Sequence, residues 1–329
     1  MLNYVGFNQD STCISCGTSD GFIIWNCRPI VKRVERINLG RIVIVEPLYR
    51  TNIIALVGDS EKWPNNQLQI WDDAQDKVHS YIKLPDAIIA VKLTRTIIVM
   101  ATKNKVYIYA CHDDIKKVVD NKLLGQMMTF ENTPCTIALN DNIVIFPGFT
   151  QGFIHAANIT STIDASSFKP NRIISAHNNS IAAVALAPDG RSLASVSTRG
   201  TVIRVWSLET GAMLFEFRRG LIGAIVTGLA FSQDNRWLVA CTGKGTTHIF
   251  DLRTPPKKDM NTTMEYINGL LPSWSFAQCR FPATEVDVRV AMDNEYNVYV
   301  VTKQAEFYWY RIDPIHGGET KIRLDAKLC

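Results

Sequence analysis

Two adjacent arginines, Arg218 and Arg219, stand inside the tetrapeptide Phe217-Arg-Arg-Gly220, which ends a segment typical of a β-strand. Successive side chains of a strand point to opposite faces, so we expect the two guanidinium groups to enter two different clefts. The planar fork of arginine suits bidentate capture of phosphate oxygens. The pair therefore predicts two anion sites. The alternative is a pair of solvated surface arginines.

The residues around this pair could complete such sites. The stretch from residue 176 to 252 also contains the cations Arg204 and Lys244 and the histidines His177 and His248. Hydroxyl side chains are frequent in the same stretch: Ser195, Ser197, Thr198, Thr201, Thr242, Thr246 and Thr247. Cations mixed with small hydroxyl donors match a phosphorylated, polyhydroxylated headgroup. Each histidine could instead have a structural role, bonded within its own sheet.

Composition and motifs restrict the other functions. The chain has 329 residues, and its net charge of +4 is too small to indicate nucleic-acid binding, so we expect no nucleic-acid partner. Motifs for a nucleophilic serine, a phosphate-binding loop or a zinc protease are missing, so we expect no enzyme activity. The Cys-x-x-Cys pair, Cys13 and Cys16, has no second half, so we expect no metal or cofactor.

A short run of β-branched or aromatic residues that ends in an anchor recurs seven times. The anchors are Trp25, Trp71, Tyr109, the degenerate Ala156, Trp206, Phe250 and Tyr310, separated by 46, 38, 47, 50, 44 and 60 residues. This period is typical of the four-stranded blade of a β-propeller. Short strands and Gly-containing turns fill the intervals, and amphipathic helical windows are missing. The sequence predicts an all-β, WD40-like propeller of seven four-stranded antiparallel blades, a single domain over residues 1–329.

The interval of 60 residues predicts an insertion at about residues 253–273, longer than a connection inside a blade needs. Met260, Met264, Ile267 and Leu271 fall on one face at helical spacing, and Tyr266 and Leu270 add apolar area. The run is too short for a stable helix in water, so we expect a loop that orders in the headgroup region of a membrane. The alternative is a loop that packs on the propeller or has no binding role.

The stretch from residue 176 to 252 resembles the PROPPINs, the β-propellers that bind polyphosphoinositides and are related to the WIPI and autophagy-related eighteen proteins. The resemblance rests on Ala176-His177-x-x-x-Ile181, Leu193–Ser197 with Gly200-Thr201-x-Ile203-Arg204-Val205, Phe217-Arg-Arg-Gly220 and Gly245-Thr246-x-His248-Ile-Phe250. The arginine tetrapeptide is weak by itself but specific in its strand, between the other two signatures. The repeat number and the insertion extend the resemblance to the whole chain.

The resemblance implies the composition of two phosphoinositide sites. The first would contain His177, Ser197, Thr201, Arg204 and Arg218. The second would contain Arg219, Thr242, Lys244, Thr246 and His248. The implied ligands are phosphatidylinositol 3-phosphate and phosphatidylinositol 3,5-bisphosphate in a membrane.

The resemblance also implies an adaptor that gathers proteins of autophagy or endolysosomal traffic. Signal-peptide features and long apolar runs are missing, so we expect a cytoplasmic protein, recruited peripherally to phagophore, endosomal or vacuolar (lysosomal) membranes. We expect a monomer. The alternative is a WD40-like protein-interaction scaffold without a lipid ligand, and the surface around Arg218 and Arg219 decides between the two.

Overall fold

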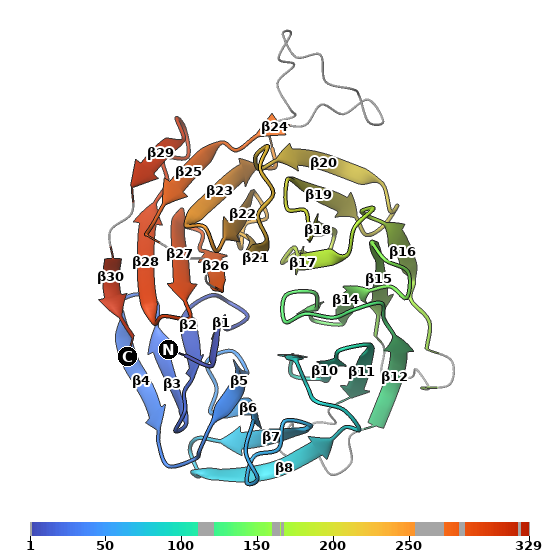
Figure 1. The fold of residues 1–329 in the computed structure, drawn as a ribbon, viewed down its shortest axis with the longest axis vertical. Helices are drawn as coiled ribbons and strands as arrows, with labels where there is room; N and C mark the ends of the chain where they lie inside the picture. Colours follow the sequence, from blue (N-terminus) through green and yellow to red (C-terminus); the bar gives the residue numbers. More distant parts are fainter. Residues whose placement is uncertain are drawn as a thin grey trace.

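The computed structural model describes residues 2–110, 122–159, 165, 168–253, 273–282, 287–321 and 324–328. The described strands form seven sheets that stand around a central axis as the blades of a propeller (Figure 1). Each blade has four consecutive antiparallel positions, and no residue in the described ranges is helical. The predicted fold is thereby confirmed.

The first four blades use consecutive strands from the centre outward. Blade 1 is β1 (Tyr4–Phe7), β2 (Cys13–Gly17), β3 (Phe22–Asn26) and β4 (Val31–Arg36). Blade 2 is β5 (Ile42–Pro47), β6 (Ile53–Gly58), β7 (Gln67–Asp72) and β8 (Lys77–Lys83). Blade 3 is β9 (Ala90–Leu93), β10 (Ile97–Thr102), β11 (Lys105–Ala110) and β12 (Lys122–Met128). Blade 4 is β13 (Ala138–Asn140), β14 (Ile143–Pro147), β15 (Phe153–Asn158) and β16 (Arg172–Ser175).

Blades 5 and 6 each carry a fifth strand at the outer edge. Blade 5 is β17 (Ile181–Leu186), β18 (Ser192–Ser197), β19 (Val202–Ser207) and β20 (Met213–Arg218), with β24 (Ser273–Trp274) parallel to β20. Blade 6 is β21 (Val226–Phe231), β22 (Trp237–Thr242), β23 (Thr246–Asp251) and β25 (Ala277–Arg280), with β29 (Gly318–Lys321) parallel to β25. Blade 7 is β26 (Val288–Met292), β27 (Asn297–Thr302), β28 (Glu306–Arg311) and β30 (Leu324–Lys327). All seven predicted anchors lie in the third strand of their blade.

The ring closes by packing between the first and last blades. Blade 1 consists of N-terminal strands and blade 7 of C-terminal strands, and β1 contacts β26 (Figure 1). The backbone N–H of Leu2 donates to the carbonyl of Lys303 at 2.8 Å. Val5 of β1 and Phe307 of β28 belong to one buried apolar cluster. Burial of apolar surface between neighbouring sheets thus joins the two ends of the chain.

The core lies in layers between successive blades, and strand alternation assigns each residue to a layer. In blade 5, Ile203 and Val205 pack toward blade 6, whereas Trp206 packs toward blade 4. The same alternation separates Cys13, which packs toward blade 2, from Cys16, which packs toward blade 7. The two thiols therefore face opposite sides of one strand, as their spacing predicts.

Antiparallel order also fixes which segments share one end of a blade. The turn between the second and third strands lies at the same end as the exit of the fourth strand. In blade 5 these are the turn after Ser197 and the exit at Arg218, and in blade 6 the turn after Thr242 lies at that end. The fold therefore brings the segments that hold the arginine pair and most of its predicted partners to one end of two neighbouring blades.

Candidate anion-binding sites on blades 5 and 6

The side chains of β20 alternate between two layers. The ring of Phe217 stacks on that of Phe250 in β23 of blade 6, with ring centroids 4.6 Å apart, and also on the ring of Phe215. Phe215 and Phe217 thus face blade 6, and the residues between and after them, Glu216 and Arg218, face blade 4.

Glu216 holds Arg204 on the side of β20 that faces blade 4. Nε of Arg204 donates to Oε2 of Glu216 at 2.8 Å, and Nη1 donates to the carbonyl oxygen of Ala176 at 2.6 Å. Glu216 is buried, so its carboxylate offsets the charge of Arg204 at close range. Arg218 lies on the same side, and its buried Nε finds no hydrogen-bond partner among the residues that the structure describes. Of the two arginines, Arg204 is therefore paired with a carboxylate, and Arg218 has no carboxylate partner among the described residues.

His177 packs into the same layer as a neutral group. Its Nε2 lies 2.9 Å from Oγ of Ser195, and that hydroxyl accepts a hydrogen bond from the indole N–H of Trp206, also at 2.9 Å. Burial, together with the nearby charge of Arg204, lowers the pKa of His177 to about 3. At neutral pH the imidazole is uncharged and can donate or accept one hydrogen bond at each nitrogen.

Ser197 and Thr201 flank the turn at this end of blade 5. Ser197 is buried and ends β18, on the same side of the strand as Ser195. Thr201 precedes β19 and is half-buried, and its carbonyl accepts from the backbone N–H of Arg219 at 2.9 Å. Thr201 therefore lies at the boundary between the two predicted groups of residues.

Arg219 is held by neutral carbonyl groups. Its Nε donates to the carbonyl of Gly200 at 2.8 Å, and its Nη2 donates to the carbonyl of Ile222 at 2.8 Å. Burial lowers the pKa of the guanidinium below its usual value, which lies far above neutrality, so the group stays charged. Because its described partners carry no negative charge, Arg219 remains available to an external anion as an electrostatic partner.

The predicted partners of Arg219 lie in blade 6, on the side that faces blade 5. Thr242, Thr246 and His248 alternate with residues that pack toward blade 7. Burial, together with the charges of Arg219 and Arg280, lowers the pKa of His248 to about 4. Nδ1 of His248 lies 3.3 Å from Oγ of Ser275. The charge of Arg219, which follows β20 of blade 5, thus reaches His248 of blade 6.

Lys244 completes this second group at the turn between β22 and β23. Its side chain is exposed, and it lines a cavity of about 420 Å³ together with Gly223, Ala224 and Ile225 from the connection between β20 and β21. Thr242 is buried at the end of β22 and pairs in register with Thr246 at the start of β23. The cavity therefore joins Lys244 to the segment that follows the arginine pair, and Thr227 and the acidic Asp287 also line it.

Sequence reasoning missed three features of this region. Glu216 neutralises Arg204, and this pairing depends on the register between β19 and β20. Arg280 stands opposite Thr246 in the sheet and pairs with Glu319 at 2.6 Å, which no local pattern indicates. The strand β24 covers part of the edge of β20, with Trp274 opposite Arg218.

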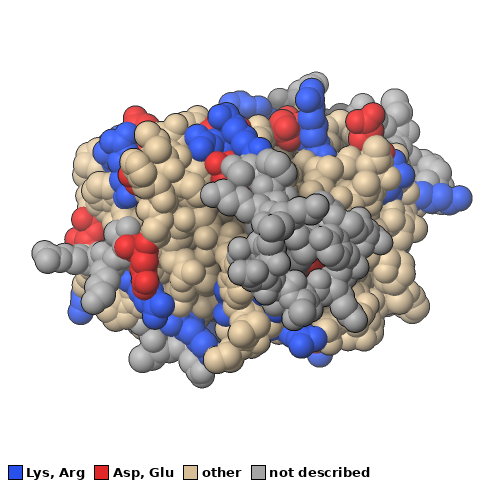
Figure 2. All heavy atoms as spheres, turned by 90° about the horizontal axis from the view of Figure 1, so that it is seen from above, with Lys and Arg blue, Asp and Glu red and all other residues tan. Residues whose placement is uncertain are grey.

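The proposed apolar residues of the insertion, Met260, Met264, Tyr266, Ile267, Leu270 and Leu271, lie outside the described residues. The strand that follows them, β24, attaches to blade 5 and not to blade 6, from which the chain departs at β23. Figure 2 views the side of the ring that lies at the top of Figure 1, where β20, β23 and β24 meet. Lys and Arg side chains lie along both rims of this side, with acidic side chains among them.

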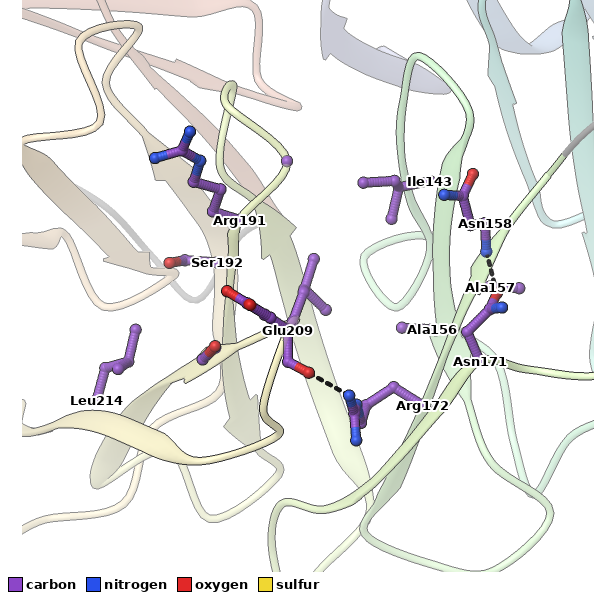
Figure 3. A pocket seen from close by; sticks show the side chains of 13 residues that line it. Ile143, Ala156, Ala157, Asn158, Asn171, Arg172, Arg191, Ser192, Glu209 and Leu214 are labelled. Atoms are coloured by element: carbon purple, nitrogen blue, oxygen red, sulfur yellow. Dashed lines mark hydrogen bonds between the residues drawn. The ribbon is translucent and has the colours of Figure 1, made fainter.

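A separate cavity of about 790 Å³ opens between blades 4 and 5. It is lined by the turns at the other end of these blades, including Arg191, Ser192 and Glu209, and none of the ten predicted headgroup residues lines it (Figure 3). Arg172 donates to the backbone carbonyl of Glu209 within it. This cavity is thus distinct from the arginine pair.

Within the described ranges, no group of three or more His, Cys, Asp or Glu residues could hold a metal ion. No helix long and apolar enough to span a bilayer occurs in the described part of the chain.

The fold and the arginine pair define a seven-bladed β-propeller with two candidate anion sites on adjoining blades. The family model named PROPPIN matches residues 1–271. The chain belongs to the PROPPIN family, which confirms the resemblance found in the sequence.

Individual relatives cover nearly the whole chain. Autophagy-related protein 18e of Arabidopsis thaliana is 29% identical over 336 residues, which cover 98% of this chain and 86% of the relative. SVP1-like protein 2 of Pichia angusta is 31% identical over 306 residues, which cover 88% of this chain and 81% of the relative.

Solved structures show the same fold. Kluyveromyces lactis Hsv2 with its complete loop 6CD matches with a TM-score of 0.80 at 21% identity, over 99% of this chain and 98% of that chain. KlAtg21, solved in complex with the coiled-coil of AgAtg16, matches with a TM-score of 0.76 at 22% identity, over 99% of this chain and 98% of that chain.

Proposed function

We propose that this propeller binds the headgroups of phosphatidylinositol 3-phosphate or phosphatidylinositol 3,5-bisphosphate at two sites, and so docks on membranes of the autophagy or endolysosomal system. The observation that carries the proposal is the division of the arginine pair between two layers. Arg218 lies on the side of blade 5 that holds His177, and Arg219 acts on His248 in blade 6. Family membership supports the same ligand class.

The chemistry of each site matches a phosphorylated inositol. In the first, Arg218 would capture phosphate oxygens, while Ser197, Thr201 and the neutral His177 would bond to phosphate and ring hydroxyls. Arg204, whose charge is offset by Glu216, would position its neighbours and offer the N–H groups that Glu216 and Ala176 do not engage. A neutral imidazole suits this role, because it bonds to a hydroxyl or a phosphate without needing a proton from solution.

In the second site Arg219 and Lys244 would supply the charge. Thr242, Thr246 and His248 would supply neutral hydrogen-bonding groups from one side of blade 6. Single headgroup contacts at an aqueous surface are weak because exposed charges are screened. Two sites on one rigid edge make the second capture intramolecular, which raises avidity by about 10²-fold or more.

The remaining parts of the chain would add membrane and protein contacts. The apolar residues at about 253–273 would enter the headgroup region next to the two sites. The surface away from this edge would recruit proteins of autophagy. One solved relative, KlAtg21, is recorded in a complex with the coiled-coil of AgAtg16, which supports a scaffold role for the rest of the propeller.

A vesicle flotation panel tests this function. Vesicles carry phosphatidylinositol, its 3-phosphate, its 4-phosphate or its 3,5-bisphosphate in a neutral lipid background. We expect the wild type to float with the 3-phosphate and 3,5-bisphosphate vesicles and the double variant Arg218→Ala/Arg219→Ala to stay at the bottom. The matched control is Lys32→Ala/Arg33→Ala, an adjacent basic pair on the outer strand β4 of blade 1. A double variant that floats like the wild type would contradict the site assignment, and a wild type that binds no vesicle would favour the scaffold alternative.

A further inference from the structure

The connection between β20 and β21 exposes a cluster of apolar side chains. Leu221 is 74% exposed, Ile222 is 77% exposed and Ile225 is 60% exposed. They lie within five residues, directly after the arginine pair. Scattered exposed apolar residues are ordinary on a protein surface, but a contiguous cluster marks an interaction site.

This connection, residues 220–225, is held firmly although its apolar side chains face outward. Arg219 donates from Nη2 to the carbonyls of Ile222 at 2.8 Å and Ala224 at 3.4 Å. The carbonyl of Ala224 also packs against Gly200, whose backbone has φ of +66° and whose position leaves no room for a side chain, because a Cβ there would lie 1.8 Å from that oxygen. The exposed residues are therefore presented by an anchored backbone.

The position of the connection relates it to both candidate sites. It starts at Arg219, and its residues Gly223 and Ile225 line the same cavity as Lys244. The apolar cluster thus adjoins the half-buried Arg219 and the exposed Lys244, both of which we assign to the second headgroup site. Neighbouring cations draw a segment toward an anionic leaflet.

We propose that residues 220–225 form a membrane contact in which Leu221, Ile222 and Ile225 enter the interfacial zone of the bilayer beside the second headgroup site. This inference rests on the proposed function. The apolar side chains gain by leaving water. Moving the backbone out of water costs little free energy, because Arg219 already donates hydrogen bonds to the carbonyls of Ile222 and Ala224. Arg219 would thus bind a headgroup and set the height of the apolar cluster above it.

The test compares membrane binding with binding of the soluble headgroup. Leu221→Ser/Ile222→Ser removes two exposed side chains that make no core contact. Half-burial of two such side chains in the membrane strengthens partitioning from water into the bilayer roughly tenfold. We expect about tenfold weaker binding to vesicles that carry phosphatidylinositol 3-phosphate, and unchanged affinity for soluble inositol 1,3-bisphosphate. The matched control is Ile37→Ser, since Ile37 is 62% exposed in the equivalent connection between blades 1 and 2 and should leave vesicle binding unchanged.

The outcomes separate this inference from the proposed function. Unchanged vesicle binding by Leu221→Ser/Ile222→Ser, with a wild type that binds, would overturn the inference and leave the headgroup sites in place. Loss of a protein partner with vesicle binding intact would also overturn it, in favour of a protein-docking surface. A wild type that binds neither vesicles nor the soluble headgroup would overturn the proposed function itself.

Discussion

Acidification should destabilise this propeller through its buried histidines, and His177 allows the effect to be measured singly. The imidazole is buried, and its pKa in the folded chain is about 3. In the unfolded chain the pKa of histidine is about 6.5. Between these values the unfolded state binds a proton that the folded state does not, so stability falls as the pH falls below about 6.5.

The magnitude follows from the two pKa values. Between pH 7 and about pH 5 the unfolded state gains about 2 kcal/mol from protonation of this single side chain, while the folded state gains almost nothing. The variant His177→Asn removes the titrating group. We therefore expect the wild type to lose about 2 kcal/mol more than His177→Asn over this interval, although the variant is less stable at pH 7 because its bond to Ser195 is altered.

Urea unfolding followed by tryptophan fluorescence at pH 7 and pH 5 measures the difference. Ser195→Ala serves as the control, because it removes the hydrogen-bond partner of His177 and leaves the titrating group in place. It should lower the free energy of unfolding at both pH values and keep the dependence on pH. Equal pH dependence in the wild type and His177→Asn would refute the argument that this histidine is buried in its neutral form.

Two further predictions concern the arginines. Arg219→Ala should lower the free energy of unfolding by about 1–3 kcal/mol because it leaves carbonyls unpaired. Arg218→Ala should lower it by under about 0.5 kcal/mol, because the Nε of Arg218 has no described hydrogen-bond partner to lose. Urea unfolding of both variants measures the difference, and equal losses would contradict the different partners of the two arginines. Arg204→Met should cost about 3–5 kcal/mol because it strands the buried carboxylate of Glu216, and the double variant Arg204→Met/Glu216→Leu should recover part of that loss. A double variant no more stable than the single one would argue against an ion-pair role.

Most of the fold could be predicted from the sequence because the repeat is visible in the residues themselves. Each anchor ends the third strand of a blade or lies near its end, and even the degenerate Ala156 falls in β15. The ring follows from the period, since each sheet needs a neighbour on both sides to bury its two faces. The two added outer strands could not be predicted. Strand β24 has two residues and β29 has four, and both are placed by pairing with distant parts of the chain.

The site could be predicted in part. Strand alternation predicts that Arg218 and Arg219 point apart. In the structure β20 ends at Arg218, and Arg219, the next residue, donates hydrogen bonds to the carbonyls of Gly200 and Ile222. The neutralisation of Arg204 by Glu216 depends on a cross-strand register that the sequence does not display. The exposure of Leu221 and Ile222 could not be predicted for another reason. An apolar run after a strand resembles the start of the next strand, and only the structure shows that these side chains are exposed.

The central claim is that the two arginines serve two separate headgroup sites, and binding stoichiometry tests it most directly. Isothermal titration of the chain with soluble inositol 1,3-bisphosphate should give two sites per chain. Arg218→Ala and Arg219→Ala should each leave one site, and the double variant should leave none. A single site in the wild type, removed by either substitution alone, would mean that both guanidinium groups act on one anion and would contradict the account.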